Sequence, residues 1–277
     1  AMNSMMWNNP INKKNVQYLQ SIGIDFIGPK IGKLKCGEFG QGRISDIKNI
    51  IKKIEDNCKS YNFFYNKKCL VTAGPTIEMI DPIRYISNQS SGKQGYEIAS
   101  QLVLNGAKVI LISGPTHLDP IPNIKLIKIQ SAKEMYEKIQ TISNIDIAFF
   151  TAAVSDFKST KIKNKKLKKD KILNLNLAKN IDILKAIGNR KKNRPKYVIG
   201  FAAETGSVNN AKQKLINKNC DIIIYNKISK SNQVFGSDYN KISIITKNYV
   251  KKFKKMTKVN CAKEIIKYVY NHQLRNE

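Results

Sequence analysis

The 277-residue sequence predicts an α/β protein with a doubly wound, mostly parallel, Rossmann-like sheet, helices on both faces and a β-hairpin extension. Three observations support this class. From residue 68 onwards, short β-branched runs alternate with segments of helical spacing, the pattern of repeated strand–helix–strand units. Each apolar run is continuous rather than alternating, as expected for parallel strands buried on both faces. Hydrophobic residues make up 42% of the chain, enough to build a core.

The first part of the chain has a different texture, because it is rich in Asn, Gly and Lys. Its spacing predicts helices at 13–22 and 46–57, whereas 28–43 contains too much Gly and Pro for regular structure. A polar and aromatic stretch without a clear period follows, which is typical of a linker. The predicted division of the chain is 1–57, a linker at 58–66, and a larger domain at 67–277.

The larger domain is predicted element by element from its apolar runs and helical spacings. The predicted strands are 69–73, 108–113, 124–129, 145–151, 197–201 and 221–225. The predicted helices are 93–105, 132–141, 181–188 and 208–218, with a hairpin at 241–246 and 249–253 and a closing helix at 260–272. Alternation of these elements with right-handed crossovers gives the open, doubly wound sheet.

The charge balance favours anionic partners. Forty-nine Lys and Arg residues against 20 Asp and Glu residues give a net charge of +29. Such a surplus suits nucleic acids, acidic lipids and small phosphates alike, and AT-rich coding alone would also raise the Lys, Ile and Asn content. The charge therefore supports no single class. No run of 18 apolar residues occurs, so we expect no membrane span.

The cysteines favour a reducing, cytoplasmic location. Their number is odd, and no two have the CxxC or CxxH spacing of a zinc site, so neither a disulfide framework nor a bound zinc ion is expected. The chain begins at Ala1 without a charged and then apolar leader, and its start is typical of the middle of a domain. We therefore expect a fragment or the product of a truncated gene.

The end of the first predicted strand is a candidate ligand site. It leads through 71–76 and 81–95 to a helix N-terminus, where a doubly wound fold binds its ligand. Ser90, Ser91, Gly92 and Lys93 offer hydroxyls, backbone N–H groups and a cation, which suit a phosphate. Neither GxxxxGK[ST] nor GxGxxG is present. A plain Gly-Ser helix cap is the alternative for these residues.

Two further strand ends carry polar or cationic groups. We expect the loop 152–157 to face Gly92 across the sheet, where the basic run 158–171 that follows it would neutralise phosphate charge. A solvated surface or a nucleic-acid patch is the alternative for this run. The strand end 200–205 precedes a helix with Lys214 and Lys218 one turn apart. Phe201 could stack on a base, although a buried strand aromatic is the commoner case. Three such strand ends together favour a site.

Together these segments resemble a known family. Four motifs resemble those of the bacterial, CTP-using phosphopantothenate–cysteine ligase of coenzyme A biosynthesis. They are LVTAGPTxExxDPxRYISNxSSGKxGxxIA, AAVxDF followed by KLKK, KNxDIL, and GFAAET with KxxxK. The resemblance covers about 67–272. It implies that 4′-phosphopantothenate, cysteine and CTP are the substrates. It also implies that Mg²⁺ binds mainly through the CTP phosphates, that the ligase domain forms a homodimer, and that the protein is cytoplasmic.

The resemblance also implies roles for individual residues. Asn88 would hydrogen-bond the acyl-cytidylate intermediate with Arg84 nearby, and Lys166 would stabilise the CMP leaving group. Gly92 and Lys93 would lie beside the bound phosphates. The residues that would hold CTP and line its pocket are Asp156, Phe201, Lys214, Lys218, Ala152, Ala153, Asn180, Ile181, Asp182 and Ile183.

The first segment resembles the C-terminal end of phosphopantothenoylcysteine decarboxylase, a flavoprotein that uses FMN. The substrate-binding Asn of that family's AMNxxM motif corresponds to Asn3. The Cys of its CGExGxGR motif, which reduces the enethiol intermediate, corresponds to Cys36. Lys35 and Ile44 stand where the family usually has Ala and Met. The family's flavin-binding core and catalytic His have no counterpart here, so we expect no decarboxylation by this chain alone, unless a separate decarboxylase half completes it.

Two other classes of protein remain as alternatives. A nucleotide- or nucleic-acid-binding Rossmann-like protein without ligase activity would suit the charge, yet no RNP, KH, zinc-finger or helix-turn-helix signature is present. A nicotinamide oxidoreductase would suit the fold, but the Gly-rich fingerprint and the acidic residue at the second strand are missing. A salt-dependent DNA shift, or a change in NADPH absorbance with a thiol substrate, would favour these alternatives.

Overall fold

The computed structural model describes residues 2–22, 24–35, 37–60, 63–168, 174–204, 207–227 and 236–274. Cys36, Lys169 and Thr205, which the sequence motifs include, lie outside the described residues. The chain forms two compact units, Ala1–Tyr61 and Asn62–Glu277, and each is described by itself. No helix among the described residues is long and apolar enough to cross a membrane.

The described residues of the first unit form three helices and one hairpin. Its helices are α1 (Ser4–Asn8), α2 (Pro10–Ser21) and α3 (Ile47–Ser60), and its strands are β1 (Lys30–Lys33) and β2 (Phe39–Arg43). The prediction that 28–43 lacks regular structure is wrong, because β1 and β2 pair antiparallel. Glycine lets the start of the chain approach β2, since a Cβ on Gly42 would meet the Met2 carbonyl oxygen at 1.9 Å. Helix α3 continues to Ser60, past the predicted start of the linker.

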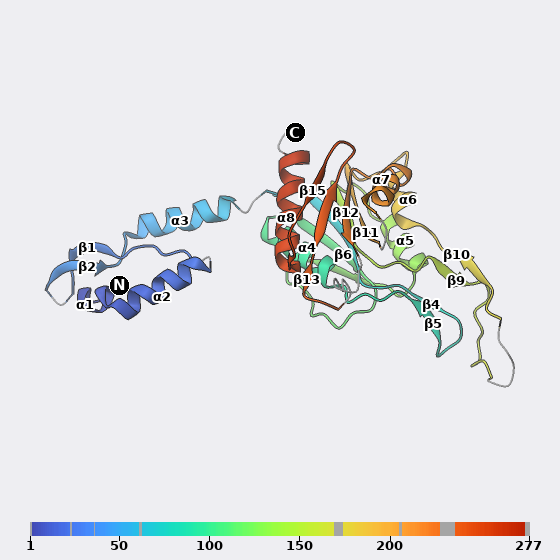
Figure 1. Ribbon diagram of the computed structural model, residues 1–277, viewed down its shortest axis with the longest axis horizontal. Coiled ribbons are helices and arrows are strands. Elements are labelled where there is room, and N and C mark those ends of the chain that lie inside the picture. The colour runs from blue at the N-terminus through green and yellow to red at the C-terminus, as the bar shows by residue number, and fades with distance from the viewer. Residues whose placement is uncertain are drawn as a thin grey trace. The chain divides into compact units, whose positions relative to one another are not determined.

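The second unit is built on an eight-stranded sheet (Figure 1). Its order is β15-β14-β12-β11-β8-β3-β6-β7, and the six strands from β12 to β7 run parallel. If these six strands are numbered as they follow in the chain and read from β7 to β12, their order in the sheet is 3-2-1-4-5-6, the Rossmann arrangement. The order reverses between β3 and β8. The hairpin β14–β15 adds antiparallel to β12. The strand bounds are β3 (Lys68–Ala73), β6 (Lys108–Ser113), β7 (Lys125–Lys128), β8 (Ile147–Phe150), β11 (Tyr197–Glu204), β12 (Ile222–Lys227), β14 (Ile242–Ile245) and β15 (Val250–Lys252).

Helices cover both faces of this sheet, as the sequence predicts. Helices α4 (Lys93–Leu104) and α8 (Lys258–Val269) pack on one face, over Val71, Leu111 and Phe149. Helices α5 (Ala132–Gln140), α6 (Ile183–Gly188) and α7 (Val208–Asn217) pack on the other, over Leu70 and Ile223. Strand residues thus alternate between two cores, which explains why each apolar run is continuous. A π-helical turn, Tyr270–Leu274, follows α8.

Three short strand pairs were not predicted. They are β4 (Ile77–Met79) with β5 (Tyr85–Ser87), β9 (Phe157–Ser159) with β10 (Leu177–Lys179), and β13 (Tyr239–Asn240) with β16 (Met256–Thr257). The pairs β4–β5 and β9–β10 lie side by side and project from one end of the sheet, and we call them the arm (Figure 1). With two or three residues to a strand, none of these pairs has a readable period.

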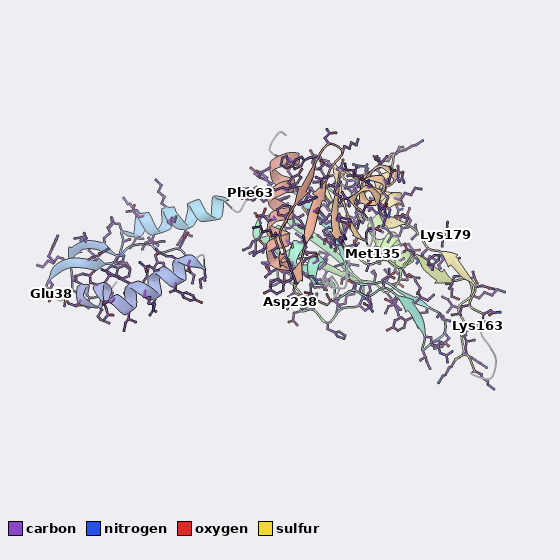
Figure 2. All side chains as sticks on the ribbon, in the orientation of Figure 1. Glu38, Phe63, Met135, Lys163, Lys179 and Asp238 are labelled. Atoms are coloured by element: carbon purple, nitrogen blue, oxygen red, sulfur yellow. The ribbon has the colours of Figure 1, made fainter. Side chains whose placement is uncertain are left out.

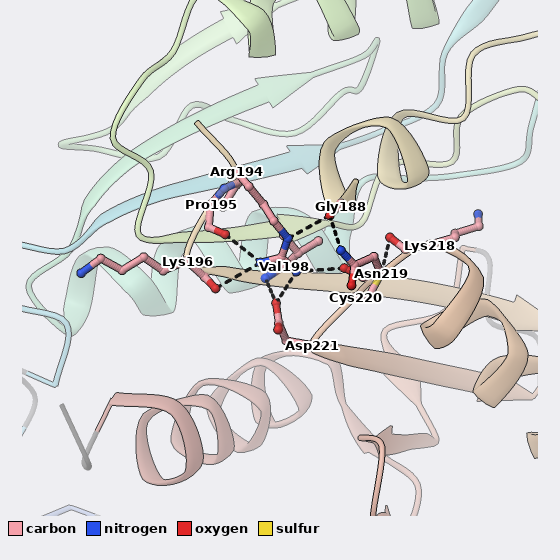
Figure 3. Close-up of polar contacts among 9 residues, drawn as sticks. All are labelled: Gly188, Arg194, Pro195, Lys196, Val198, Lys218, Asn219, Cys220 and Asp221. Carbon is pink, nitrogen blue, oxygen red and sulfur yellow. Dashed lines mark hydrogen bonds and ion pairs between the residues drawn. The ribbon is translucent and has the colours of Figure 1, made fainter. Parts of the chain in front are cut away.

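Arg194 connects several elements at the amino ends of β11 and β12 (Figure 3). Its guanidinium donates to the carbonyls of Gly188 and Asn219 at 2.9 Å and to the Asp221 carboxylate at 3.0 Å. The same Asp221 oxygen accepts the Val198 N–H at 2.7 Å. One side chain thereby fixes the end of α6 and the starts of β11 and β12.

We therefore expect Arg194→Met to lower the free energy of unfolding by roughly 1–3 kcal/mol, because it leaves part-buried carbonyls and a carboxylate without their donor. Urea denaturation followed by circular dichroism measures this change. Lys196→Met is the matched control, since Lys196 is exposed and its ion pair with Asp146 is 3.6 Å long. The control should change stability by less than about 1 kcal/mol. Equal losses in the two variants would contradict the role of Arg194.

Candidate nucleotide and anion site

A cavity of about 510 Å³ opens at the carboxyl ends of the parallel strands, where the strand order reverses between β3 and β8. This is the place where doubly wound sheets bind ligands, and the volume suits a nucleotide-sized molecule. Residues from β3, β8, β11, β12, α4, α6 and α7 line it. The sequence placed its candidate site at these strand ends, because parallel strands end along one edge of a sheet.

Two glycines bring helix α4 close to this cavity. Gly92 precedes the helix with φ +74°, and a Cβ there would meet Thr116 Cγ2 at 2.7 Å. A Cβ on Gly95 would meet Ala73 Cβ at 2.6 Å and Thr151 Oγ1 at 2.4 Å. Gly92 therefore supplies the left-handed turn, and Gly95 the close helix–strand contact, that a GxGxxG fingerprint supplies elsewhere. Without a side chain, Gly92 leaves the start of α4 uncapped.

Most of the predicted site residues come together in this cavity. Its lining includes Asn88, Gly92, Lys93, Ala152, Ala153, Asp156, Ile181, Asp182, Ile183, Phe201, Lys214 and Lys218. Asn88 donates through Nδ2 to the Val154 carbonyl at 2.8 Å, which joins the loop after β5 to the loop after β8. Asn180 lies just outside the lining; its backbone N–H donates to the Asp156 carbonyl at 2.8 Å, and its Nδ2 is buried without a partner.

Ion pairs place the cationic side chains of the site. Lys214 pairs with Glu204 at the end of β11, and Lys218 pairs with Asp182 at 3.2 Å. Asp182 also caps α6 by accepting the Lys185 N–H at 3.0 Å. Lys93 pairs with Asp238, and that ammonium holds the pKa of the Asp238 carboxyl below its usual range. Each of these three lysines thus has a carboxylate partner that orients it beside the cavity.

Arg84 and Lys166 lie on the arm and do not line the cavity. The Asp81 carboxylate is fully buried and accepts backbone N–H groups from Ile83 and Arg84 at 2.8 Å and from Leu167 at 3.1 Å. These hydrogen bonds, with the nearby Arg84 guanidinium, lower the pKa of Asp81. Arg84 also donates to the Leu167 carbonyl at 3.4 Å. Asp81 therefore holds the two segments together.

The described part of the basic run follows the arm, whereas Ala152, Ala153 and Asp156 of the loop before it line the cavity together with Gly92. The β9–β10 pairing leads the chain away from the sheet, and the Lys163 N–H donates to the Ile80 carbonyl at 2.9 Å. Lys163 and Lys179 mark this part of the chain in Figure 2. Lys166 is exposed beside Leu167 and is not among the residues that line the cavity.

Sequence reasoning missed a group of polar residues on the α4–α8 side of the cavity. Asn226, Asn240 and Lys258 all line it, and each is at most 6% exposed. The Oδ1 atom of Asn226 is buried without a hydrogen-bond partner. No motif marks these residues, because they come from β12, β13 and α8 and meet only in the folded chain. Buried polar atoms without partners at a cavity are available to a ligand.

The described residues of the first unit do not build a flavin site. Asn3 is exposed and caps α1 by accepting the Met5 N–H at 2.8 Å. In the described part of this unit no apolar side chain is buried, whereas a flavin ring needs an enclosed site that orients it. We therefore derive no step through FMN for this chain. Among the residues with described positions, no group of three or more His, Cys, Asp or Glu could hold a metal ion.

The three described cysteines, Cys69, Cys220 and Cys261, are buried free thiols. Burial raises the pKa of Cys220 and of Cys261 to about 12, and it raises the pKa of Cys69 as well. These thiols therefore stay protonated at neutral pH and act as core residues.

Fold and cavity define a Rossmann-like protein with a lysine-lined ligand site at its topological switch point. The model of the DNA/pantothenate metabolism flavoprotein C-terminal domain matches residues 64–272, and the flavoprotein model matches 1–59. The coenzyme A biosynthesis bifunctional protein CoaBC of Borreliella burgdorferi is 43% identical over 98% of this chain and 69% of its own length. The chain belongs to this family, which confirms the resemblance predicted from the motifs.

Two further relatives agree. The CoaBC protein of Bacillus subtilis is 38% identical over 97% of this chain and 68% of its own length, so the chain spans about two thirds of each of these relatives. A crystal structure of the C-terminal domain of a CoaBC protein superposes with a TM-score of 0.66 at 36% identity, and covers 78% of this chain and 100% of that one. The α/β fold with a mostly parallel sheet is thereby confirmed.

Proposed function

We propose that this chain ligates 4′-phosphopantothenate to cysteine at the expense of CTP, through an acyl-cytidylate, as a step of coenzyme A biosynthesis. One observation carries the proposal: Asn88, Lys93, Phe201, Lys214 and Lys218 converge from separate elements on a single cavity at the switch point. An aromatic ring, an amide and several cations are the groups that a nucleotide triphosphate and a carboxylate substrate need. Membership of the coenzyme A biosynthesis family supports the same assignment.

In the first step a carboxylate oxygen of 4′-phosphopantothenate attacks the α-phosphorus of CTP. The bond to the β-phosphate breaks, and pyrophosphate leaves with its electron pair. The lysines of the cavity and the start of α4 would stabilise the charge that gathers on the phosphates. Mg²⁺, bound mainly through the CTP phosphates, would share that charge. Asn88 suits the carboxylate because its amide offers a donor without a repelling charge.

In the second step the cysteine amine attacks the acyl carbon of the acyl-cytidylate. The acyl–oxygen bond breaks, CMP leaves with its electron pair, and the amine loses a proton to water. Lys166 would stabilise the departing CMP phosphate. Because Asp81 anchors its neighbour Leu167 on the arm, outside the cavity lining, this role requires the arm to carry the Lys166 ammonium towards the cavity.

Pyrophosphate release tests the choice of nucleotide. With 4′-phosphopantothenate and Mg²⁺, we expect CTP to support release at least about 10-fold faster than ATP, a difference of about 1.4 kcal/mol in barrier height. Omission of 4′-phosphopantothenate is the control and should abolish release. Equal or faster release with ATP would contradict the CTP assignment, and release without the acid would indicate simple nucleotide hydrolysis.

A further inference from the structure

Lys258 is a buried lysine of the cavity that no sequence motif marks. It is the first residue of α8, is 6% exposed, and lines the cavity beside Gln94 and Asn240. Its backbone is held on both sides: its N–H donates to the Asp238 carbonyl at 2.8 Å, and its carbonyl accepts from Gln94 Nε2 at 3.3 Å. The backbone of Lys258 is therefore held at the place where α8 meets α4.

The ammonium of Lys258 has no hydrogen-bond or ion-pair partner among the described residues. The other three lysines of the cavity differ, since Lys93, Lys214 and Lys218 each pair with a carboxylate. An ammonium on a mostly buried side chain loses part of its hydration, and no described group of the free protein replaces it. A lysine in such a position indicates an anionic ligand.

In the protein without ligand, the surroundings of Lys258 further destabilise its positive charge. Lys258 starts a helix, where the macrodipole favours anions, and the Gln94 contact brings the uncapped start of α4 to the same place. Lys93 adds a like charge, and the exposed Asp238 only partly offsets it. Burial and Lys93 together lower the pKa of the Lys258 ammonium. An anion between the two helix starts would relieve all of these costs.

We propose that Lys258 binds a phosphate group of a substrate, together with the uncapped N-terminus of α4. The identity of that substrate rests on the proposed function, which supplies two phosphate sources: the triphosphate of CTP and the 4′-phosphate of phosphopantothenate. The nearby Asn226 and Asn240 amides add polar groups, and the Asn240 contact with Gln94 Oε1 is long at 3.4 Å. Lys93, already paired with Asp238, adds positive charge at the rim of the same site.

Calorimetric titration of the full chain tests this proposal with Lys258→Met, Lys258→Arg and the exposed Lys263→Met from the same helix as control. The ligands are CTP, pyrophosphate, 4′-phosphopantothenate and pantothenate. We expect Lys258→Met to weaken one phosphate ligand about 10- to 100-fold, as loss of a charged hydrogen bond implies. Lys258→Arg should recover part of that affinity, and Lys263→Met should bind like the parent chain.

The pattern of losses separates the two sources. Weaker binding of CTP and pyrophosphate, with 4′-phosphopantothenate binding unchanged, assigns Lys258 to the triphosphate. Weaker binding of 4′-phosphopantothenate alone assigns it to the 4′-phosphate. In that case Lys258→Met should bind pantothenate, which lacks the phosphate, with the affinity of the parent chain. Equal binding of every phosphate ligand by Lys258→Met and the parent chain overturns the proposal, as does a parent chain that binds none. A parent chain that binds phosphates through Lys258 but makes no product overturns only the ligase assignment.

The folded state of each variant is checked by thermal unfolding without ligand. Lys258→Met should be at least as stable as the parent chain, because the substitution removes a buried, unpaired charge and keeps a long apolar stem. A clear loss of stability in this variant would show that the ammonium supports the fold, and would overturn its assignment to a ligand.

Discussion

Lys166→Gln should leave the first step intact and block the second. Pyrophosphate release in a single turnover should persist, whereas formation of phosphopantothenoylcysteine should fall by about 100-fold or more, because a neutral amide stabilises the CMP leaving group poorly. The acyl-cytidylate should therefore accumulate, and mass spectrometry of the quenched reaction detects it directly.

Lys163→Gln is the matched control, since it removes a charge from the same exposed stretch of the arm. This control should form product at nearly the rate of the parent chain, which separates the position of Lys166 from the general charge of the run. Normal product formation by Lys166→Gln would rule out its role in the second step. Equal losses in both variants would indicate a charge effect of the whole arm.

Asn88→Asp should stop the reaction before the acyl-cytidylate forms. The asparagine donates to the Val154 carbonyl at 2.8 Å, and an aspartate there would set two acceptors against each other. Its charge would also repel the carboxylate of 4′-phosphopantothenate. We expect pyrophosphate release to fall about 100-fold or more, the magnitude typical of a lost donor at a reacting centre.

Asn193→Asp makes the same chemical change on an exposed residue in the turn before β11 and serves as the control. Its pyrophosphate release should match that of the parent chain. Stopped assays at several concentrations of 4′-phosphopantothenate separate a loss of binding from a loss of rate. Release by Asn88→Asp within about threefold of the parent would remove Asn88 from the first step, since the missing difference in barrier would be under about 1 kcal/mol.

Much of the larger domain could be predicted because its elements are long enough to show a period. The runs 69–73 and 108–113 match β3 and β6 closely, since a strand buried on both faces is apolar at every position. The cavity was likewise predictable in part, because loops after parallel strands share one edge of the sheet. Ala152, Phe201 and Gly92 are in its lining for that reason.

What could not be predicted depends on contacts between distant segments. The strands at 77–79 and 85–87 have three residues each, too few for alternation to distinguish them from a loop. The hairpin within 28–43 depends on close backbone approach at glycines, which in the sequence indicate a turn. Lys258 has no motif, because its burial arises only where α8 packs on α4.

Mass spectrometry of the quenched reaction of the full chain tests the central claim most directly. With CTP, 4′-phosphopantothenate and Mg²⁺ but no cysteine, the account predicts a species with the combined mass of 4′-phosphopantothenate and CMP less water. Addition of cysteine should convert that species into CMP and phosphopantothenoylcysteine. Pyrophosphate release with no such species at any quench time, or CTP cleavage to CDP and phosphate, would contradict an acyl-cytidylate ligase.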